Sequence, residues 1–582
     1  MRLPEFILLV LLTLHLLACQ TESPALPGFT GEATPDIQLN QVGYYPDQAI
    51  QFTVAATGTS ALDRPDSSYQ ITNLAGDSLV REGYLGQRQD WTALAGVLAQ
   101  PTLADPLPVG DYRIYVPGVG YSGVVHVAED ALHAPFIGSL RGLYYQRASQ
   151  ALPEQYAGEY ARAAGHPDTE VRYHPSSGHG GGSMSSPGGW YDAGDYNKYI
   201  VNGAFPMGQY LALYEDVGDP APDGSLNIPE SGNGQSDYLD EMRYELDWML
   251  TMQDADGGLF HKLTTLNFEG MVMPNEATSQ RYIVGKSTTA TLDFAAATAQ
   301  ASRVYRPLDA AYADRLLAAA RRAYAWGTAN ANAVFRNPDD VHTGEYGDDN
   351  ADDERTWAAA ELFAATGEQE YYNELRARPP RVRFNAGESW TGYMGNLAAY
   401  TLLRFPDRVP QEMHQELQQL VITLADSLVM DVNQNPYRQP ITQFEWGSNS
   451  DVLNAAMLLA AAHRQEPKAD YVAAMRSSVD YVLGNNPNNV CYLTGYGDRA
   501  PMNIHHRPSI ADGIAAPVPG LLSGGPNSKQ QDKQYTTYEA GAAPMQSWAD
   551  QEPSFASNEI CLNWNAPFTY LTGYLEHVGA AK

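Results

Sequence analysis

Cysteine, basic residues and long apolar runs are all scarce in this chain of 582 residues. Three cysteines are too few for a disulfide scaffold, although the sequence allows one bridge, between Cys491 and Cys561. The 36 lysines and arginines face 68 acidic residues, and a formal net charge of -32 argues against a nucleic-acid partner, since phosphate would be repelled. Beyond residue 19 no stretch is apolar for long enough to form a membrane helix. These scarcities favour a neutral polymer as the partner.

Residues 1–19 have the pattern of a lipoprotein signal peptide. Arg2 precedes an apolar stretch, 6–17, that is too short to cross a bilayer comfortably. The stretch leads into Leu-Leu-Ala-Cys, which resembles the bacterial lipobox. We therefore expect a lipidated Cys19 and an exported protein, periplasmic or on the cell surface, that touches a membrane only through this lipid. Ordinary cleavage that removes Cys19 is the alternative. Residues 20–35, rich in Pro, Gly, Ser and Thr, predict a flexible tether.

Residues 36–128 alternate short β-rich runs with turn formers. Tyr112, Ile114 and Val116 recur with the period of two that is typical of a strand with one buried face. The expected strands are 50–54, 69–71, 111–116 and 122–127. Their number and length predict a small β-sandwich. We expect it to brace the rest of the chain, because no aromatic platform for sugar binding stands out.

Residues 134–580 change to alanine-rich segments in which apolar residues recur every three or four positions. Helices are expected at 137–148, 201–214, 239–253, 288–305, 310–326, 354–366, 393–403, 411–427, 451–463, 469–483 and 566–575. A count near twelve predicts a barrel of paired helices, with a solenoid or two bundles as alternatives. Loops at one end of such a scaffold are the usual place for chemistry.

The first loop that stands out is Gly-Gly-Trp-Tyr-Asp-Ala-Gly-Asp at 188–195. Asp192 and Asp195 lie three residues apart, and two close carboxylates raise the pKa of one another. Aromatic faces beside them suit the apolar faces of sugar rings. An acidic, solvated turn is the alternative reading.

Two further polar loops lie near the end of the chain. His505-His506-Arg507 suits hydrogen bonding to a polar ligand better than zinc, since adjacent histidines rarely point the same way and no HExxH motif or cysteine pair is near. A structural loop is the alternative. Glu559 follows Asp550 in the segment 548–566, and either residue alone could be an ordinary helix or loop acid.

Together the three segments resemble the family-nine glycoside hydrolases, mostly cellulases. Residues 188–195 match that family's double-aspartate stretch, His505 and Arg507 its histidine signature, and 550–566 its acidic signature. Residues 36–128, with Leu-Asn-Gln-Val-Gly-Tyr at 39–44, resemble the immunoglobulin-like module that often precedes such domains. The resemblance implies a mainly α protein, an (α/α)6 barrel after an immunoglobulin-like β-sandwich.

The resemblance also implies hydrolysis with inversion. Asp195 would be the general base, Asp192 would help to hold the water, and Glu559 would be the general acid with a raised pKa. The two reacting carboxyl groups should then lie roughly 6.5–9.5 Å apart. The residues expected to contact the sugar are His505, Arg507, Trp190, Tyr191, Tyr196, Asp550 and Trp564. Core packing is the alternative for each of these aromatic residues.

Departures from the family pattern occur at Cys491, Cys561 and Trp564, which flank the catalytic positions and affect subsite detail. No cofactor is expected for the chemistry. A structural calcium ion is expected at residues that resemble the family's calcium loop, with a solvated acidic loop as the alternative: Thr343, Asp348, Asp353 and Glu354. A zinc site that some relatives carry is expected to be absent, since His166, His174 and His179 lack cysteine neighbours.

The sequence thus predicts an endo-acting β-1,4-glucanase whose partner is a β-glucan. The protein is expected to be a monomer. An exo-acting glucosidase or glucosaminidase of the same fold is one alternative. An inactive glycan-binding lipoprotein is another, disfavoured because all three acids are present. An adhesion protein fits the acidic and aromatic loops least well.

Overall fold

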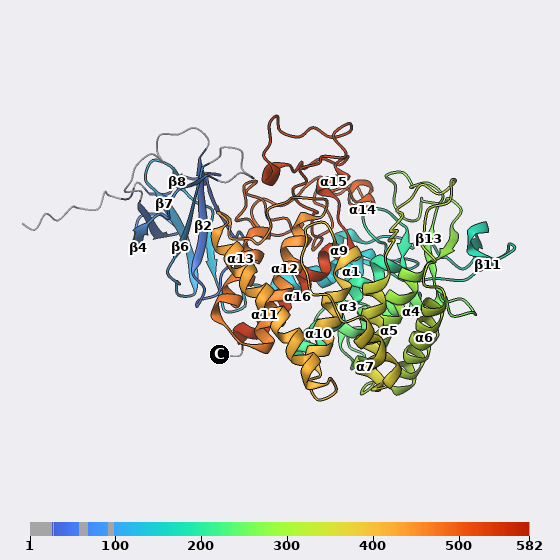
Figure 1. Cartoon of the computed structure of the whole chain (residues 1–582). Helices are drawn as coiled ribbons and strands as arrows, with labels where there is room; N and C mark the ends of the chain where they lie inside the picture. Colours follow the sequence, from blue (N-terminus) through green and yellow to red (C-terminus); the bar gives the residue numbers. More distant parts are fainter. Residues whose placement is uncertain (1–25, 27, 57–67, 91–92, 94–97, 581–582) are drawn as a thin grey trace, which may run out of the picture.

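The computed structural model describes residues 26, 28–56, 68–90, 93 and 98–580 (Figure 1). The predicted signal peptide, Cys19 and the first part of the predicted tether lie outside the described residues. Within them, no helix has the length and apolar character needed to cross a membrane.

The N-terminal strands form two antiparallel sheets that share one apolar core. One sheet has the order β1-β2-β6-β5; the other has the order β4-β3-β7-β8, with β9 also paired to β7. Phe52 and Val54 of β2 pack in one cluster with Ile71 of β3 and Ile114 of β7. The bounds are β1 (Ile37–Leu39), β2 (Ile50–Ala56), β3 (Ser68–Asn73), β4 (Leu79–Tyr84), β5 (Gln89–Asp90), β6 (Leu98–Ala104), β7 (Gly110–Val116), β8 (Gly120–Tyr121) and β9 (Val125–Val127). This is the sandwich that the alternating pattern predicts.

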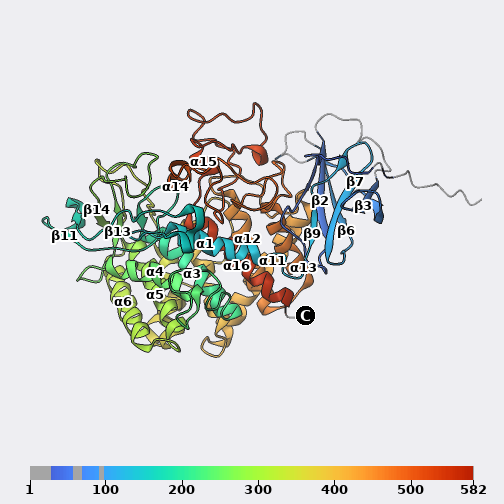
Figure 2. The same cartoon turned by 180° about the vertical axis from the view of Figure 1, so that it is seen from behind.

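The remaining chain alternates between an outer and an inner layer of helices (Figures 1 and 2). The inner helices are α3 (Ile200–Val217), α5 (Thr288–Tyr305), α7 (Asp352–Thr366), α10 (Met394–Arg404), α12 (Ser448–Gln465) and α16 (Leu562–Ala580). The outer helices are α1 (His133–Gln146), α4 (Asp237–Thr251), α6 (Ala310–Ala329), α8 (Gln369–Ala377), α11 (Gln411–Gln434) and α13 (Ala469–Val482). Each inner helix packs on the next, and α16 closes the ring on α3.

Burial explains which helices are inside. Nearly every residue of α5 is buried, and its many alanines let neighbouring helices approach closely. The helix begins at Ser287, whose hydroxyl accepts a hydrogen bond of 3.1 Å from the Ala290 amide. Outer helices such as α11 bury only one stripe, including Leu417, Val421 and Ala425. Apolar character on all sides therefore selects the inner ring.

Shorter elements cover the end of the barrel where the inner helices α3 and α16 begin. A five-stranded sheet has the order β11-β10-β14-β13-β12. Its strands are β10 (Val171–Tyr173), β11 (Ser183–Met184), β12 (Lys198–Tyr199), β13 (Phe260–Thr264) and β14 (Tyr282–Lys286). The short helices are α2 (Glu154–Ala157), η3 (Gly158–Tyr160), η4 (Pro175–Ser177), α9 (Ser389–Gly392), α14 (Arg507–Ala511), η5 (Pro544–Gln546) and α15 (Phe555–Asn558). The loops that carry α14 and α15 lie above the helices in Figure 1.

The sandwich is docked on the barrel by buried polar contacts. Asp480 of α13 accepts hydrogen bonds from Asn40 at 2.7 Å and from Gln48 at 2.8 Å. Gln51 of β2 accepts a bond of 2.7 Å from the Ser477 hydroxyl. The sandwich therefore lies against α13, as Figures 1 and 2 both show.

Candidate active site

Two distant segments bring the predicted acids together because each leads into an inner helix. Asp192 and Asp195 precede β12 and α3, whereas Glu559 lies between α15 and α16. Ala193 forms an antiparallel bridge with Cys561, and the Leu562 amide donates to the Asp192 carbonyl oxygen at 3.0 Å. The packing of α16 on α3 thus holds the two segments side by side.

Gly194 is the residue around which three loops meet. Its amide lies 3.3 Å from Oε1 of Glu559, and its carbonyl oxygen accepts bonds from Arg507, at 3.1 Å from the amide and 2.7 Å from Nη1. A Cβ at this position would lie 2.0 Å from the His505 carbonyl oxygen. Only glycine allows this close approach.

Asp192 is a buried carboxylate with both oxygens engaged. Oδ1 accepts from Asn202 at 2.6 Å, and Oδ2 accepts from the Tyr346 hydroxyl at 2.7 Å. Burial and the neighbouring Asp195 carboxylate raise the pKa of Asp192 well above its usual value, while the two hydrogen bonds oppose that rise. Asp192 is therefore fixed in place, and burial beside Asp195 disfavours a negative charge on it.

Asp195 is held by one oxygen only. Its Oδ2 accepts from the Asn197 amide group and, at 3.2 Å, from the Tyr199 hydroxyl, whereas Oδ1 has no partner within the described residues. Burial raises the pKa of Asp195, and the positive charge of Arg507 is the largest influence that lowers it. The arrangement supports an ionised carboxylate with one oxygen left for a ligand.

Glu559 has the environment of a proton donor. Burial is the main cause that raises the pKa of its carboxyl group well above the usual value, followed by the negative charge of Asp195. Arg507 opposes this rise. A glutamic acid with a raised pKa keeps its proton at a working pH near neutrality. The site therefore contains two carboxyl groups in different surroundings, of which Asp195 suits a proton acceptor and Glu559 a proton donor.

His505 and Arg507 are both at the site. Arg507 Nε donates to the Glu269 carbonyl oxygen at 3.0 Å and its Nη1 donates to that of Gly194, so these two donors hold the aspartate loop. The predicted contact of Arg507 with the sugar stays a prediction. His505 stays partly exposed, and its Nδ1 lies 2.7 Å from the Glu552 carbonyl oxygen. That carbonyl can only accept, so Nδ1 carries the proton and Nε2 is the acceptor.

His506 points away from the site. Its Nε2 lies 3.0 Å from Gln146 Oε1 and its Nδ1 lies 2.8 Å from the Ser509 hydroxyl. Burial lowers its pKa to about 3, so the ring is neutral. His506 is a structural residue that ties α1 to α14.

The predicted stacking residues are core residues, which corrects that part of the sequence interpretation. Trp190 and Tyr191 are each 1% exposed, and Tyr196 is 2% exposed. Their polar atoms are used inside: Trp190 Nε1 donates to Glu241 at 2.8 Å, and the Tyr196 hydroxyl donates to the Val272 carbonyl oxygen at 2.6 Å. Trp564 is also buried, against Gly447 and Gly524. None of these rings has a face open to a sugar.

Other aromatic rings do have exposed surface next to the acids, and the sequence interpretation missed them. Phe555, four residues before Glu559, has its ring centroid 5.5 Å from that of Trp446 and 6.1 Å from that of His505. Trp446 is 41% exposed. Trp390 of α9 packs 5.2 Å from Tyr346, which contacts Asp192. The sequence signal that could have found these aromatic residues is their position directly beside signature residues. Trp446, for example, directly precedes Gly-Ser-Asn at 447–449.

Asp550 braces the loops. Its carboxylate accepts from the amides of Met502, at 2.9 Å, and Asn503, at 2.7 Å. It also accepts from the Asn558 side chain at 3.1 Å. Asp550 therefore joins the histidine loop to the segment that carries Glu559, and its predicted sugar contact stays a prediction.

The two described cysteines are free and buried, so the bridge left open by the sequence does not form here. Cys561 lies behind Asp192: its Sγ is 3.1 Å from Asn202 Nδ2 and 3.8 Å from the Tyr346 hydroxyl. It packs on the two residues that hold that aspartate.

Thr343 does not fit the predicted calcium set. Lys262 Nζ, a buried cation, donates to Thr343 Oγ1 at 3.1 Å, to the Gly344 carbonyl oxygen at 2.7 Å and to Asn337 Oδ1 at 2.7 Å. The Thr343 carbonyl oxygen accepts from Asn337 at 2.7 Å. A second cation at this hydroxyl would be repelled by the ammonium group.

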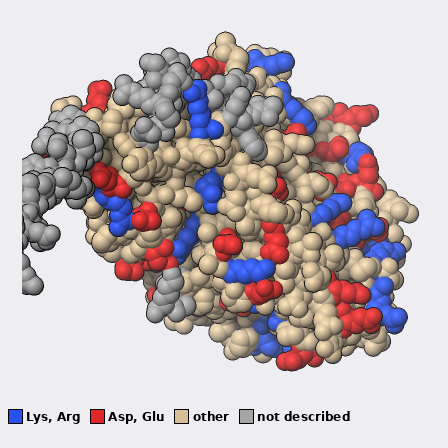
Figure 3. Space-filling model, turned by 60° about the vertical axis from the view of Figure 1, so that its left-hand side comes forward, with Lys and Arg blue, Asp and Glu red and all other residues tan. Residues whose placement is uncertain are grey.

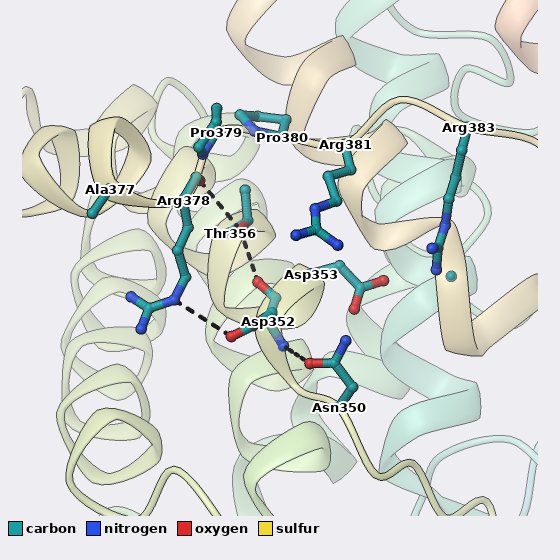
Figure 4. Close-up of a pocket in the computed structure, with 11 residues that line it drawn as sticks. Asn350, Asp352, Asp353, Thr356, Ala377, Arg378, Pro379, Pro380, Arg381 and Arg383 are labelled. Atoms are coloured by element: carbon teal, nitrogen blue, oxygen red, sulfur yellow. Dashed lines mark hydrogen bonds and ion pairs between the residues drawn. The ribbon is translucent and has the colours of Figure 1, made fainter.

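The acidic residues of the predicted set lie apart from that lysine cage. Asp348, Asp353 and Glu354 each have at least one buried carboxylate oxygen without a hydrogen-bond partner in the described chain, and so does Asp293 of α5. Asp353 lines a cavity of about 230 Å³, where it lies beside Arg381 and Arg383 while Asp352 turns to Arg378 (Figure 4). No group of three or more His, Cys, Asp or Glu side chains in the described residues already surrounds a metal position.

Known proteins resemble this chain over most of its length. Residues 135–572 match the model of glycosyl hydrolase family 9. A xyloglucan-specific endo-beta-1,4-glucanase of Bacteroides ovatus is 37% identical over 562 residues, which cover 93% of each chain. Endoglucanase D of Acetivibrio thermocellus is 33% identical over 559 residues, 94% of this chain and 81% of the relative.

Solved structures agree. A family 9 protein of Bacteroides ovatus superposes with a TM-score of 0.85 at 35% identity, covering 94% of this chain and 99% of the other. A metagenome-derived family 9 endoglucanase superposes with a TM-score of 0.86 at 33% identity, covering 93% of this chain and 98% of the other. The paired helices are thus the (α/α)6 barrel predicted, and the N-terminal sheets agree with an immunoglobulin-like module. Since the family match spans more than half of the sequence, the protein belongs to glycosyl hydrolase family 9 and is a glycoside hydrolase.

Proposed function

We propose that the protein hydrolyses internal β-1,4-glucosidic bonds of a β-glucan with inversion at the anomeric carbon. The observation that carries this proposal is the meeting of Asp192, Asp195 and Glu559 around Gly194, with an arginine that favours ionised Asp195 and a raised pKa at Glu559. Endoglucanase relatives at 33–37% identity over most of the chain support the substrate class and the endo mode.

In the proposed mechanism each acid has one task. Asp195, fixed through Oδ2 by Asn197 and Tyr199, accepts a proton through Oδ1 from a water that attacks the anomeric carbon. Asp192 helps to hold this water. Glu559 gives its proton to the glycosidic oxygen as the bond from that oxygen to the anomeric carbon breaks. Proton exchange with solvent then restores an ionised Asp195 and a protonated Glu559.

Proton NMR of a soluble β-1,4-glucan during digestion tests this mechanism. Attack from the face opposite the leaving group gives the α-anomer first, with the β-anomer growing later by mutarotation. An early β-anomer signal would show retention and overturn the assignment of Asp195 as a base. No signal with any β-glucan, including xyloglucan, together with calorimetric glycan binding would favour the inactive binding protein.

The endo mode has its own test. Internal cleavage lowers the viscosity of a glucan solution long before many reducing ends appear. A loss of viscosity that only keeps pace with reducing-end release would favour the exo-acting alternative. The relatives include proteins named cellodextrinase and cellulose 1,4-beta-cellobiosidase, so the comparison is needed.

A structural calcium ion is part of the proposal, at a set that differs from the sequence prediction. Asp293 and Glu354 are fully buried, and neither carboxylate has a hydrogen-bond partner for either oxygen in the described residues. Burial and the charges of Asp353 and Asp348 raise the pKa of Asp293 well above its usual value. Unpaired buried carboxylate oxygens are what a calcium ion requires as ligands. We expect Asp293, Asp348, Asp353 and Glu354 to hold it, without Thr343.

Metal analysis of protein purified in calcium buffer tests this site. We expect a stoichiometric amount of calcium, a lower melting temperature after EDTA, and recovery on adding calcium. Asp293→Asn should abolish both the bound calcium and the EDTA effect. Equal melting curves with and without EDTA, with no metal bound, would overturn the calcium site and leave an acidic cluster without a metal ion.

Export and lipid attachment at Cys19 rest on the sequence of residues 1–19. Labelling with a radioactive fatty acid should mark the wild type and not Cys19→Ser, and fractionation should move that variant away from the membrane. A monomer is the expected state. Light scattering during size-exclusion chromatography should give a mass near 63.6 kDa, less any cleaved signal peptide.

A further inference from the structure

A second cavity lies between the sandwich and the barrel, and none of the three catalytic acids lines it. It has a volume of about 540 Å³ and is lined from the sandwich by Gln48 and Gln51 and from α13 by Arg476 and Asp480. Arg438, after α11, completes its polar wall, and Val472, Ala473 and Val578 are among its apolar lining residues. Interfaces between domains are common places for small-molecule sites.

Two arginines in this interdomain cavity have unused donors. Arg476 is 7% exposed; its Nη2 pairs with Asp47 at 3.2 Å and its guanidinium lies 4.8 Å from the centroid of the Tyr45 ring. Its Nε is buried without a hydrogen-bond partner in the described residues. Arg438 donates from Nη2 to Asn433 at 2.8 Å, and its Nε is likewise buried and unpaired within the described chain. Burial lowers the pKa of both arginines. Asp480 is the nearby carboxylate that favours the charged form of both arginines, yet both buried Nε donors stay unpaired within the described chain.

The acceptors around them are already engaged. Both oxygens of Asp480 accept amide hydrogens, from Asn40 and Gln48, and Gln51 Oε1 accepts from Ser477. What the cavity lacks is therefore a further hydrogen-bond acceptor for the two unpaired Nε donors, since a buried donor without a partner costs free energy. Arg438 also has a φ of 50°, a strained conformation for a residue other than glycine, and such strain clusters at ligand sites.

We propose that the interdomain cavity binds a small organic carboxylate, such as a uronic acid, whose carboxylate bridges Arg438 and Arg476. Planar guanidinium groups match the two oxygens of a carboxylate, and the apolar lining accommodates the carbon skeleton. On the side of the molecule shown in Figure 3, Lys and Arg side chains lie among the acidic ones, so no single-sign surface surrounds the sandwich there. At physiological ionic strength, salt screens the repulsion between a bound carboxylate and acidic side chains more than about 8 Å away.

Isothermal titration calorimetry of the full chain tests this site at constant ionic strength. Sodium glucuronate and citrate are the probes, and glucose is the uncharged control of nearly the same shape as glucuronate. We expect saturable binding of a carboxylate and none of glucose. Binding of glucuronate would identify a uronic acid site, and binding of citrate alone a site for non-sugar acids. The measurement does not depend on glucan hydrolysis, so it can fail or succeed independently of the proposed function.

Variants separate ligand binding from domain docking. Arg438→Met, which loses no contact between the domains, and Arg476→Met should each weaken binding at least about tenfold. Asp47→Asn removes the interdomain ion pair but keeps both guanidinium groups, so its affinity should be unchanged or higher. The proposal is overturned if neither carboxylate binds, if glucose binds equally well, if Arg438→Met binds like the wild type, or if Asp47→Asn weakens binding as much as Arg476→Met.

Discussion

At the scale of residues, the carboxyl groups of the buried Asp195 and the half-buried Glu559 differ in their neighbours. Two donors and a nearby arginine favour the ionised form of Asp195, whereas Glu559 accepts one long bond from Gly194 and faces two aspartates. A protonated Glu559 matters only when the leaving oxygen needs a proton. The same variant should therefore behave differently with good and poor leaving groups.

Glu559→Gln should lower kcat on β-glucan about 10²- to 10⁴-fold, the usual contribution of general acid catalysis. With 2,4-dinitrophenyl β-cellobioside, whose leaving group departs as a stable anion, the loss should be far smaller. Steady-state kinetics on both substrates checks this, with circular dichroism as the control for folding. Equal losses on the two substrates would assign Glu559 a role other than proton donation.

Lys262 of β13 is a buried cation close enough to influence Asp195. Its ammonium group is bound only by neutral oxygens, and burial lowers its pKa to about 7 against the charge of Asp195. Lys262→Met should remove a positive charge that favours ionised Asp195 and move the acid limb of the kcat/KM profile upward by roughly 1 pH unit. Lys262→Arg should keep the wild-type limb. An unshifted limb in a stable Lys262→Met protein would contradict the prediction.

At the scale of elements, the loops above the barrel divide aromatic residues into two groups. Trp446 and Phe555 have surface available to a sugar, whereas Tyr196 is buried beside Tyr191 and Ala277 with its hydroxyl bonded to Val272. Trp446→Ala should raise KM on cello-oligosaccharides up to about tenfold, since ring contacts of this kind contribute roughly 0.5–1.5 kcal/mol, while the melting temperature stays near that of the wild type.

Tyr196→Phe is the matched variant for the buried group. It removes one internal hydrogen bond and should lower stability by about 1 kcal/mol without changing KM. The two variants should thus show opposite patterns in thermal unfolding and in kinetics. A KM change in Tyr196→Phe without a stability change would restore the stacking role predicted from the sequence.

At the scale of the whole molecule, Asp480 couples the docking of the sandwich to pH. Burial raises the pKa of Asp480 to about 7, although Asn40, Gln48 and Arg476 oppose this. In the unfolded chain the pKa is about 3.9, so the folded protein binds the extra proton between these values. Its stability should therefore fall as the pH rises from about 4 through 7, with little further change from this group above that range.

Asp480→Asn cannot titrate, so the stability difference between wild type and variant isolates this effect. The free energy of unfolding of the wild type, relative to that of Asp480→Asn, should fall by on the order of 2–4 kcal/mol between pH 4 and pH 8. Urea unfolding at several pH values gives the measurement. A constant difference across this range would mean that Asp480 is not a raised-pKa group in the docked protein.

Much of the fold was predictable because it depends on local pattern. Eleven of the twelve paired helices were expected, most of them within a few residues of their ends, although α11 continues seven residues beyond its expected end at 427. The helix α8 was missed because it is short and polar on most sides. The sheet β10 to β14 was missed because its strands have two to five residues and pair across long separations, as Lys198 does with Leu263. Short strands carry too little periodicity to be recognised.

The sequence by itself determined the family, the alternation of helices and the three acids, since apolar periodicity and a spaced motif are properties of neighbouring residues. Only the tertiary structure decided which polar groups face the ligand. Arg507 and Asp550 brace loops, Trp190 became core, and Lys262 took the Thr343 hydroxyl that was expected to bind calcium. Burial and the identity of hydrogen-bond partners depend on segments hundreds of residues apart, because α3 and α16 bring them together only in the closed ring.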